Sequence, residues 1–231
     1  MFVSLVIPAL NEEESIGSVL AAIPQDAVDE IIVVDGGSTD NTAAIAQAAG
    51  ARVICEPRRG YGRACAIGTA AASGDIVLFL DGDGADDPSQ IPDLLAPILS
   101  GEADLVLGSR LAGEMAPDAM PWHQRFGNRL AARMIHWLYG LPLTDLSPFR
   151  AVKRESLLGL RMKDMTHGWP TEMIVKAARN DWRIVEVPVR YRPRLGGTSK
   201  IGGTVRGTVL ATYHILRTIL GYAGGKRERD G

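Results

Sequence analysis

Short runs of apolar residues alternate with amphipathic stretches along the first half of the chain. Each run is rich in branched side chains and ends near a Gly, Pro or Asp, which is typical of buried strands. The stretches between them repeat apolar residues at helical spacing, as Ile16, Val19, Leu20 and Ile23 do. The expected strands are Val3–Ile7, which Pro8 stops, Ile31–Val34, Arg52–Cys55, Ile76–Leu80 and Asp104–Leu107.

Strands that alternate with helices form a parallel sheet with right-handed crossovers and helices on both faces. The sequence therefore predicts an α/β fold with a mostly parallel, doubly wound sheet. The first helix is expected to have its cap at Asn11 or a nearby residue and the acids Glu12 to Glu14 in its first turn, where they suit the helix dipole. Further helices are expected up to about Ala49, over Arg63–Ala72 and over Pro88–Leu99.

The second half of the chain is less regular. Its patterns predict a loop and strand entry over Asp145–Phe149, extended pieces on either side of Pro188, and a mobile loop over Arg194–Gly203, which has four glycines in ten residues. Three helices are expected, over Gln124–Tyr139, Thr171–Arg179 and Thr204–Tyr222, and the tail 223–231 is expected to be flexible.

Composition and charge narrow the class of protein. An apolar fraction of 46% and a charged fraction of 23% are ordinary for a globular protein, and no apolar run reaches the length of a membrane span. No secretory signal is visible and the two cysteines have no metal-type spacing, so we expect a cytoplasmic protein. Charge is uneven, because residues 1–108 hold 17 acids and 4 bases whereas residues 109–231 hold 10 acids and 21 bases. This asymmetry suggests a metal-holding half beside a half that faces phosphate or a membrane.

The strongest chemical signal is the pair Asp81 and Asp83, which directly follows the most apolar expected strand. Ligands of open α/β sheets bind at the carboxyl ends of the strands. Two carboxylates this close repel each other and are tolerated best beside a cation. The alternative interpretation is a polar turn in which Asp and Gly serve turn chemistry alone.

Two further acidic loops, Asn11–Glu14 and Asp35–Asp40, follow strands of the same expected sheet and would share its edge. A dinucleotide-binding oxidoreductase would also place an acid after the second strand. That class needs a glycine-rich turn after the first strand, whereas residues 8–13 contain no glycine and two acids. A divalent cation at Asp81 and Asp83 is the more economical way to neutralise a diphosphate.

The chain resembles family 2 glycosyltransferases of the GT-A fold in residues 6–12, 33–42 and 81–83. Residues 105–110, 145–151 and 194–200 are similar to the branch that transfers mannose or glucose to dolichyl or polyprenyl phosphate. The resemblance runs from about Phe2 to Gly221. It implies a GT-A domain over 1–203, with a nucleotide-sugar half to about residue 110 and an acceptor half from 111, then an amphipathic helix over 204–222.

The resemblance also implies a nucleoside pocket and a metal site. The pocket would be lined by Pro8, Ala9, Asn11 and Glu12, with Asp35 accepting a hydrogen bond from uracil or guanine. Many relatives carry a second Asp after the first in that loop, but Gly36 stands here. Mg²⁺ or Mn²⁺ would bind at Asp81 and Asp83, with Asp83 as the direct ligand and Asp81 reaching the ribose, or the metal through water.

Phosphate-binding cations are expected among Arg110, Arg129, Arg194 and Lys200, since guanidinium and ammonium groups both bind phosphate. Lys200 lies in the glycine-rich loop and would close over a bound donor. Asp145 is a candidate contact of the acceptor or the sugar. Glu172 is either a general base for a hydroxyl acceptor or a partner of its helix dipole. The expected catalytic set is Asp83, Glu172 and Lys200.

These observations favour an inverting, metal-dependent transfer of a hexose from a UDP- or GDP-sugar to a polyprenyl phosphate. Two alternatives stay open: transfer to a soluble hydroxyl acceptor with Glu172 as base, and a non-catalytic nucleotide-sugar-binding or membrane-associated subunit. The last helix has an apolar stripe and a basic tail, so residues 204–222 would contact the inner face of the cell membrane, the protein core or a second subunit of a homodimer. A nucleic-acid partner is not expected.

Overall fold

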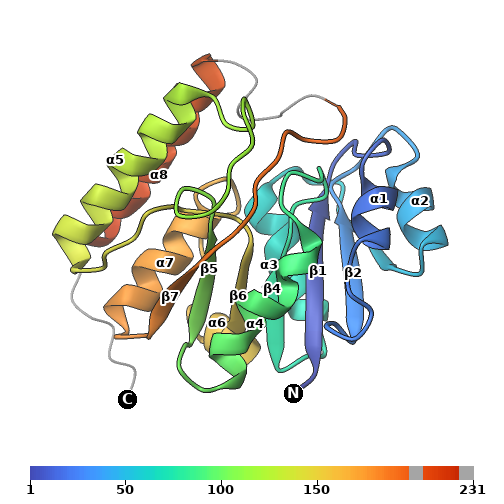
Figure 1. The fold of residues 1–231 in the computed structure, drawn as a ribbon, viewed down its shortest axis with the longest axis horizontal. Coiled ribbons are helices and arrows are strands. Elements are labelled where there is room, and N and C mark those ends of the chain that lie inside the picture. The colour runs from blue at the N-terminus through green and yellow to red at the C-terminus, as the bar shows by residue number, and fades with distance from the viewer. Residues whose placement is uncertain (198–204, 224–231) are drawn as a thin grey trace.

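The computed structural model describes residues 1–197 and 205–223, with the side chains of the last helix from residue 212 onward. A seven-stranded sheet with the strand order β3-β2-β1-β4-β6-β5-β7 forms the centre of the molecule (Figure 1). All neighbouring strands are parallel except at β6, which runs antiparallel to both β4 and β5. The predicted α/β, mostly parallel sheet is confirmed. The strands are β1 (Val3–Ala9), β2 (Glu30–Asp35), β3 (Arg52–Cys55), β4 (Ile76–Phe79), β5 (Leu105–Ser109), β6 (Arg150–Lys153) and β7 (Ile184–Pro188).

Helices bury both faces of this sheet. One core forms where α1, α2 and α4 pack on the sheet, and a second forms beneath α3, α6 and α7. Figure 1 shows α5 and α8 side by side beyond the β7 edge, and α8 also packs against α7. The helices are α1 (Ile16–Ala21), α2 (Thr42–Ala48), α3 (Tyr61–Ala71), α4 (Ile91–Leu99), α5 (Trp122–Tyr139), α6 (Arg154–Gly159), α7 (Trp169–Arg179) and α8 (Val205–Ala223).

Two expected boundaries near the N-terminus are wrong for local reasons. Pro8 does not stop β1. The pairing of β1 with β4 ends at Val6, so residues 7–9 of β1 are paired with β2 alone, and a proline, which has no N–H group, is tolerated at such an edge. The first helix begins at Ile16 instead of next to Asn11. The backbone N–H groups of Glu12 and Glu13 are already bonded to the side chains of Thr42 and Asp40, so the acidic loop is held against the next loop and not wound into the helix.

The ends of the remaining elements differ little from expectation. Pro88–Gln90 forms a short 3₁₀ turn ahead of α4, and α5 begins two residues before the expected Gln124. Tyr191 is not in a strand but makes isolated bridges to Asp86 and Met115. The glycine-rich loop and the tail, for which mobility was expected, lie largely outside the described residues.

The last helix forms as predicted and packs on the domain through one side. Ile219 is fully buried, and its carbonyl oxygen accepts a hydrogen bond from the Tyr139 hydroxyl at 2.6 Å. The Tyr222 hydroxyl donates to Glu172 at 2.6 Å, while Tyr213 and Leu220 stay exposed. Among the described helices, none combines the length and the apolar character needed to cross a bilayer.

Candidate functional site

A cavity of about 650 Å³ lies at the carboxyl ends of β1, β2 and β4. It brings together seven residues that the sequence pointed to: Pro8, Ala9, Glu12, Asp81, Asp83, Arg110 and Arg194. The loops after three parallel strands thus share one edge, as the order of strands and acidic loops predicted. The opposite wall comes from α5 and α8, through Gln124, Gly127, Asn128, Thr212 and Ile215.

Asp81 and Asp83 both bring carboxylates to the lining of this cavity. Burial and the neighbouring Asp83 charge raise the pKa of Asp81 to about 7, although the Tyr61 hydroxyl donates to its Oδ1 at 3.1 Å. Asp83 Oδ1 accepts the N–H of Ala85 at 3.0 Å, and its Oδ2 lies 4.0 Å from Arg194. Raising the pKa of a carboxyl group this far means that its negative charge lacks sufficient compensation.

Two nearby cations are committed to other groups. Arg194 Nη2 is held by both carboxylate oxygens of Glu12, at 3.0 and 2.9 Å. Arg150 is completely buried, and its guanidinium donates to the carbonyl oxygens of Ser147 and Pro170. The Asp81 and Asp83 pair therefore keeps an unbalanced negative charge at the mouth of the central strand.

This donor set fits a hard divalent cation that takes its remaining ligands from a substrate. Across residues 1–197 and 205–223, no group of three or more His, Cys, Asp or Glu side chains could hold a metal by itself. Mg²⁺ is typically bound by one or two carboxylates together with waters and phosphate oxygens of the substrate. Asp81 and Asp83 supply that number of carboxylates, and a dication would offset the burial and the Asp83 charge that raise the pKa of Asp81.

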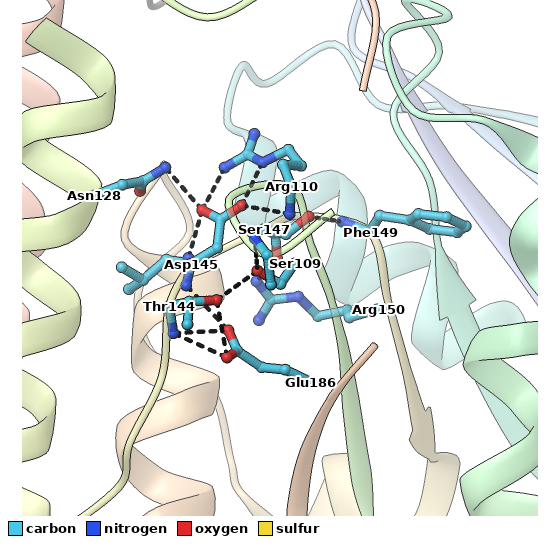
Figure 2. A network of polar contacts seen from close by, with 11 residues as sticks. Ser109, Arg110, Asn128, Thr144, Asp145, Ser147, Phe149, Arg150 and Glu186 are labelled. Carbon is cyan, nitrogen blue, oxygen red and sulfur yellow. Dashed lines mark hydrogen bonds and ion pairs between the residues drawn. The ribbon is translucent and has the colours of Figure 1, made fainter. Parts of the chain in front are cut away.

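Arg110 is aimed into the cavity by a buried carboxylate (Figure 2). Asp145 is fully buried and accepts hydrogen bonds from Arg110 Nε at 2.7 Å and Arg110 Nη2 at 2.9 Å. Asn128 of α5 donates to the same carboxylate at 2.8 Å. Burial alone would raise the pKa of Asp145, but Arg110 and these hydrogen bonds bring it below its ordinary value. The guanidinium of Arg110 also lies 5.0 Å from the ring centre of Tyr191, so its orientation is fixed on two sides.

A second carboxylate supports this network from below. Glu186 of β7 accepts the backbone N–H groups of Thr144 and Asp145, at 2.9 and 3.0 Å, and the Thr144 hydroxyl contacts Ser109 at 2.5 Å (Figure 2). Both oxygens of Asp145 thus already accept hydrogen bonds within the protein, and its expected contact with the acceptor or the sugar stays a prediction. Asp145 is a positioning residue for Arg110.

Three other expected site residues among the described ones lie outside the cavity lining. Asn11 is exposed and binds the neighbouring loop, since its Oδ1 accepts the N–H of Thr39 at 2.8 Å. Asp35 is buried and accepts hydrogen bonds from the N–H and hydroxyl of Ser38, while the adjacent Gly36 lines the cavity. Arg129 is exposed on the outer side of α5. Lys200 lies outside the described residues.

Glu172 has the surroundings of a structural carboxylate. It is fully buried, accepts the backbone N–H groups of Lys163 and Asp164, and forms an ion pair with Lys176 at 2.9 Å. Burial raises the pKa of Glu172, but the hydrogen bonds from Tyr222 and Lys176 outweigh that effect and lower it. Glu172 lines a separate cavity formed with α8, so the structure does not bring it to Asp83.

Several cavity residues were not part of the expected site. Arg59 and Tyr61 follow β3, and His167 and Tyr191 approach from the second half of the chain. The loop after the third parallel strand must end at the same edge as the acidic loops, and this could have indicated Arg59 and Tyr61. Tyr191 follows the carboxyl end of β7, which is parallel to β5, and could have been indicated in the same way. His167 follows no strand end, and it was not part of the expected catalytic set.

Comparisons with known proteins agree with this geometry. The model of glycosyl transferase family 2 matches residues 4–160. An uncharacterized glycosyltransferase of Mycobacterium tuberculosis is 43% identical over 217 residues, which cover 94% of this chain and 97% of that protein. A dolichyl-phosphate hexose transferase of Haloferax volcanii is 35% identical, over 84% of this chain and 85% of that protein.

A solved structure is similar over nearly the whole chain. Glucosyl-3-phosphoglycerate synthase from Mycobacterium tuberculosis, in complex with Mn²⁺, UDP and phosphoglyceric acid, superposes with a TM-score of 0.78 at 28% identity. The match covers 98% of this chain and 80% of that chain.

Replacing Asp81 by Asn should stabilise the protein in the absence of a metal ion. The folded protein holds a proton on Asp81 up to about pH 7, whereas the unfolded chain releases it near the ordinary value of 3.8. The folded state thus binds more protons in this interval, and the contribution of Asp81 to stability falls as pH rises through it. Thermal unfolding should show an Asp81→Asn advantage that is small near pH 4 and largest above pH 7. The exposed Asp26→Asn serves as control, and a pH-independent or negative difference would contradict the charge imbalance.

Truncating Asp145 should cost far more stability than removing the whole ion pair. Asp145→Ala leaves the buried Arg110 guanidinium without its partner, which should lower the free energy of unfolding by about 3–5 kcal/mol. The double variant Arg110→Met/Asp145→Leu removes both charges and should recover most of that loss in urea unfolding. Equal destabilisation by the single and double variants would show that Asp145 does not act through Arg110.

Proposed function

The chain belongs to glycosyl transferase family 2, and from its site we propose that it transfers a hexose from a UDP-sugar to the phosphate of a polyprenyl phosphate, with Mg²⁺ or Mn²⁺ bound at Asp81 and Asp83. The observation that carries the acceptor class is Arg110, a guanidinium preset in the cavity by a fully buried carboxylate. The solved relative with Mn²⁺ and UDP supports the choice of nucleotide and ion over a GDP-sugar.

On the donor side, each residue has a distinct task. Pro8, Ala9 and Gly36 leave a smooth wall for the nucleoside, and Asp83 presents a carboxylate that is still 23% exposed. Tyr61 holds Asp81 in place by its hydroxyl. When bound, the cation would stabilise the negative charge on the leaving nucleoside diphosphate. Arg194, now paired with Glu12, lies 4.0 Å from Asp83 and is placed to turn toward the donor phosphates.

On the acceptor side, a phosphate needs no general base, because it is already ionised near neutral pH. Its oxygen attacks the anomeric carbon, the bond from that carbon to the diphosphate breaks, and the electron pair leaves with the nucleoside diphosphate. Among the described lining residues, the carboxylates are Glu12, Asp81 and Asp83, which lie on the donor side. Arg110 uses Nε and Nη2 for Asp145, so its Nη1 remains to bind the acceptor phosphate.

A second candidate is transfer to a hydroxyl group of a soluble phosphorylated acceptor. It is favoured by the bound phosphoglyceric acid of the solved relative. Glu172 is poorly placed to act as its base, whereas His167 lines the cavity. Burial lowers the pKa of His167, although Asp164 opposes this, and the imidazole is therefore neutral and able to accept a proton near pH 7.

The acceptor assay separates the two candidates. We expect release of UDP from a UDP-hexose with Mn²⁺ to require polyprenyl phosphate and to be unaffected by His167→Gln. With a hydroxyl acceptor such as phosphoglyceric acid, the same variant would lose about 10²–10⁴ in rate. Arg110→Lys keeps a charge opposite Asp145 but removes one arm of the fork, and should raise KM for the phosphate acceptor about tenfold.

Glu172→Gln is the matched control in that assay, because it changes a buried carboxylate outside the cavity. It should lower thermal stability and leave the rate per folded molecule unchanged. Turnover with phosphoglyceric acid and none with polyprenyl phosphate would overturn the proposed acceptor.

A further inference from the structure

The outer side of α5 exposes large apolar side chains in a regular stripe. Trp122, Phe126, Leu130 and Trp137 are 78%, 64%, 37% and 83% exposed. Their spacing of four, four and seven residues places them on one side of a helix that turns every 3.6 residues. The opposite side is packed, since Ala131, Ala132 and Ile135 are buried. Figure 1 shows α5 at the edge of the molecule, with its far side away from the sheet.

Basic residues accompany this stripe. Arg129, Arg133 and His136 are exposed and, at 100° per residue, lie beside the apolar positions. Helix α5 contains no Asp or Glu, and neither does the sequence of the neighbouring α8. We call the surface formed by Trp122, Phe126, Arg129, Leu130, Arg133 and Trp137 the α5 face.

The same helix forms part of the active-site wall. Gln124, Gly127 and Asn128 line the cavity, and Asn128 binds the carboxylate that positions Arg110. One side of α5 therefore faces the cavity while another side carries the exposed stripe. Any surface that covers the α5 face lies within one helix diameter of the acceptor side of the cavity.

We propose that the α5 face docks onto the surface of an anionic lipid bilayer; this rests on the proposed lipid-phosphate acceptor and names the partner of that site. An amphipathic helix whose exposed apolar residues are accompanied by basic residues lies in the plane of the interface. Tryptophan side chains concentrate at the boundary between headgroups and hydrocarbon, and α5 has one near each end of its stripe. Arginines near an anionic leaflet contribute about 1 kcal/mol each.

A second copy of the chain fits this surface less well. A symmetric dimer would place the same patch on both sides of its interface. Arg129 and Arg133 would then face the partner's arginines, with no acid on α5 to separate them. An anionic bilayer supplies the missing negative charge and accepts the apolar stripe together. The expected contact through 204–222 is weaker in its described part, where Tyr213 and Leu220 are exposed and Ile219 is buried.

Vesicle cosedimentation of the full chain tests this docking. Wild type should bind vesicles of phosphatidylcholine with phosphatidylglycerol, bind pure phosphatidylcholine weakly, and lose binding as salt is raised. Trp122→Gln/Phe126→Gln/Trp137→Gln should abolish binding, whereas the exposed control Leu99→Gln/Leu158→Gln should bind as wild type does. Arg129→Gln/Arg133→Gln should lower the partition coefficient about thirtyfold, and Arg52→Gln/Arg161→Gln should leave it unchanged.

Thermal unfolding measured with and without UDP and Mn²⁺ separates this inference from the proposed function. All of these variants should still be stabilised against thermal unfolding by UDP with Mn²⁺. The docking would be overturned if the triple aromatic variant bound vesicles as wild type does. It would also be overturned if the wild type bound no vesicles but formed a dimer that this variant dissociated. Neither outcome would contradict the proposed function. If the wild type bound vesicles but was not stabilised by UDP with Mn²⁺, the docking surface would be supported and the proposed function would be contradicted.

Discussion

The site is built around two neighbouring carboxylates, Asp81 and Asp83, whose negative charge the protein does not fully compensate. Asp81 and Asp83 stand at the end of the central strand β4, where burial and their mutual charge raise the pKa of Asp81 to about 7. A polar turn chosen for shape alone would not gather two more acidic loops at the same edge. The sheet order puts β1 between β2 and β4, so the loop of Glu12 lies beside the pair. The result is a cluster of acidic side chains at one edge of the sheet, which fits the cation and the diphosphate of the proposed transfer from a nucleotide sugar.

The other carboxylates near the cavity have different tasks, set by their hydrogen bonds. Asp145 uses its oxygens to aim Arg110, and Glu186 holds the loop on which Asp145 stands. Glu12 restrains Arg194, the cation nearest to Asp83 in the described lining. Glu172 closes the junction of α7 and α8 through Tyr222 and Lys176. Arg110 and Arg194 thereby line the same cavity as the Asp81 and Asp83 pair while each is bonded to another carboxylate, and in the proposed reaction each would bind one phosphate group.

Sequence patterns could predict the sheet and the position of Asp81 and Asp83 at its edge, because both depend on local order. Buried strands are continuous apolar runs, and parallel strands bring their carboxyl ends to one edge. What the patterns could not predict depends on helix phase and on distant partners. Asn128 and Arg129 are adjacent in the sequence, yet one step of about 100° turns the first toward Asp145 and the second to solvent. From the sequence, Glu172 fits a general base or a helix-dipole partner equally well. Only the structure shows that its carboxylate accepts hydrogen bonds from the backbone N–H groups of Lys163 and Asp164. Asp35 resembles a base-binding acid, but Ser38, three residues later, takes up its carboxylate.

The most direct test of the central claim is a crystal structure of the protein soaked with Mn²⁺ and UDP, with the ion located by anomalous scattering. The account predicts a manganese peak bound by the Asp83 carboxylate, with Asp81 beside it and the UDP phosphates completing the coordination. Manganese bound elsewhere, or UDP bound with both aspartates turned away from its phosphates, would contradict it.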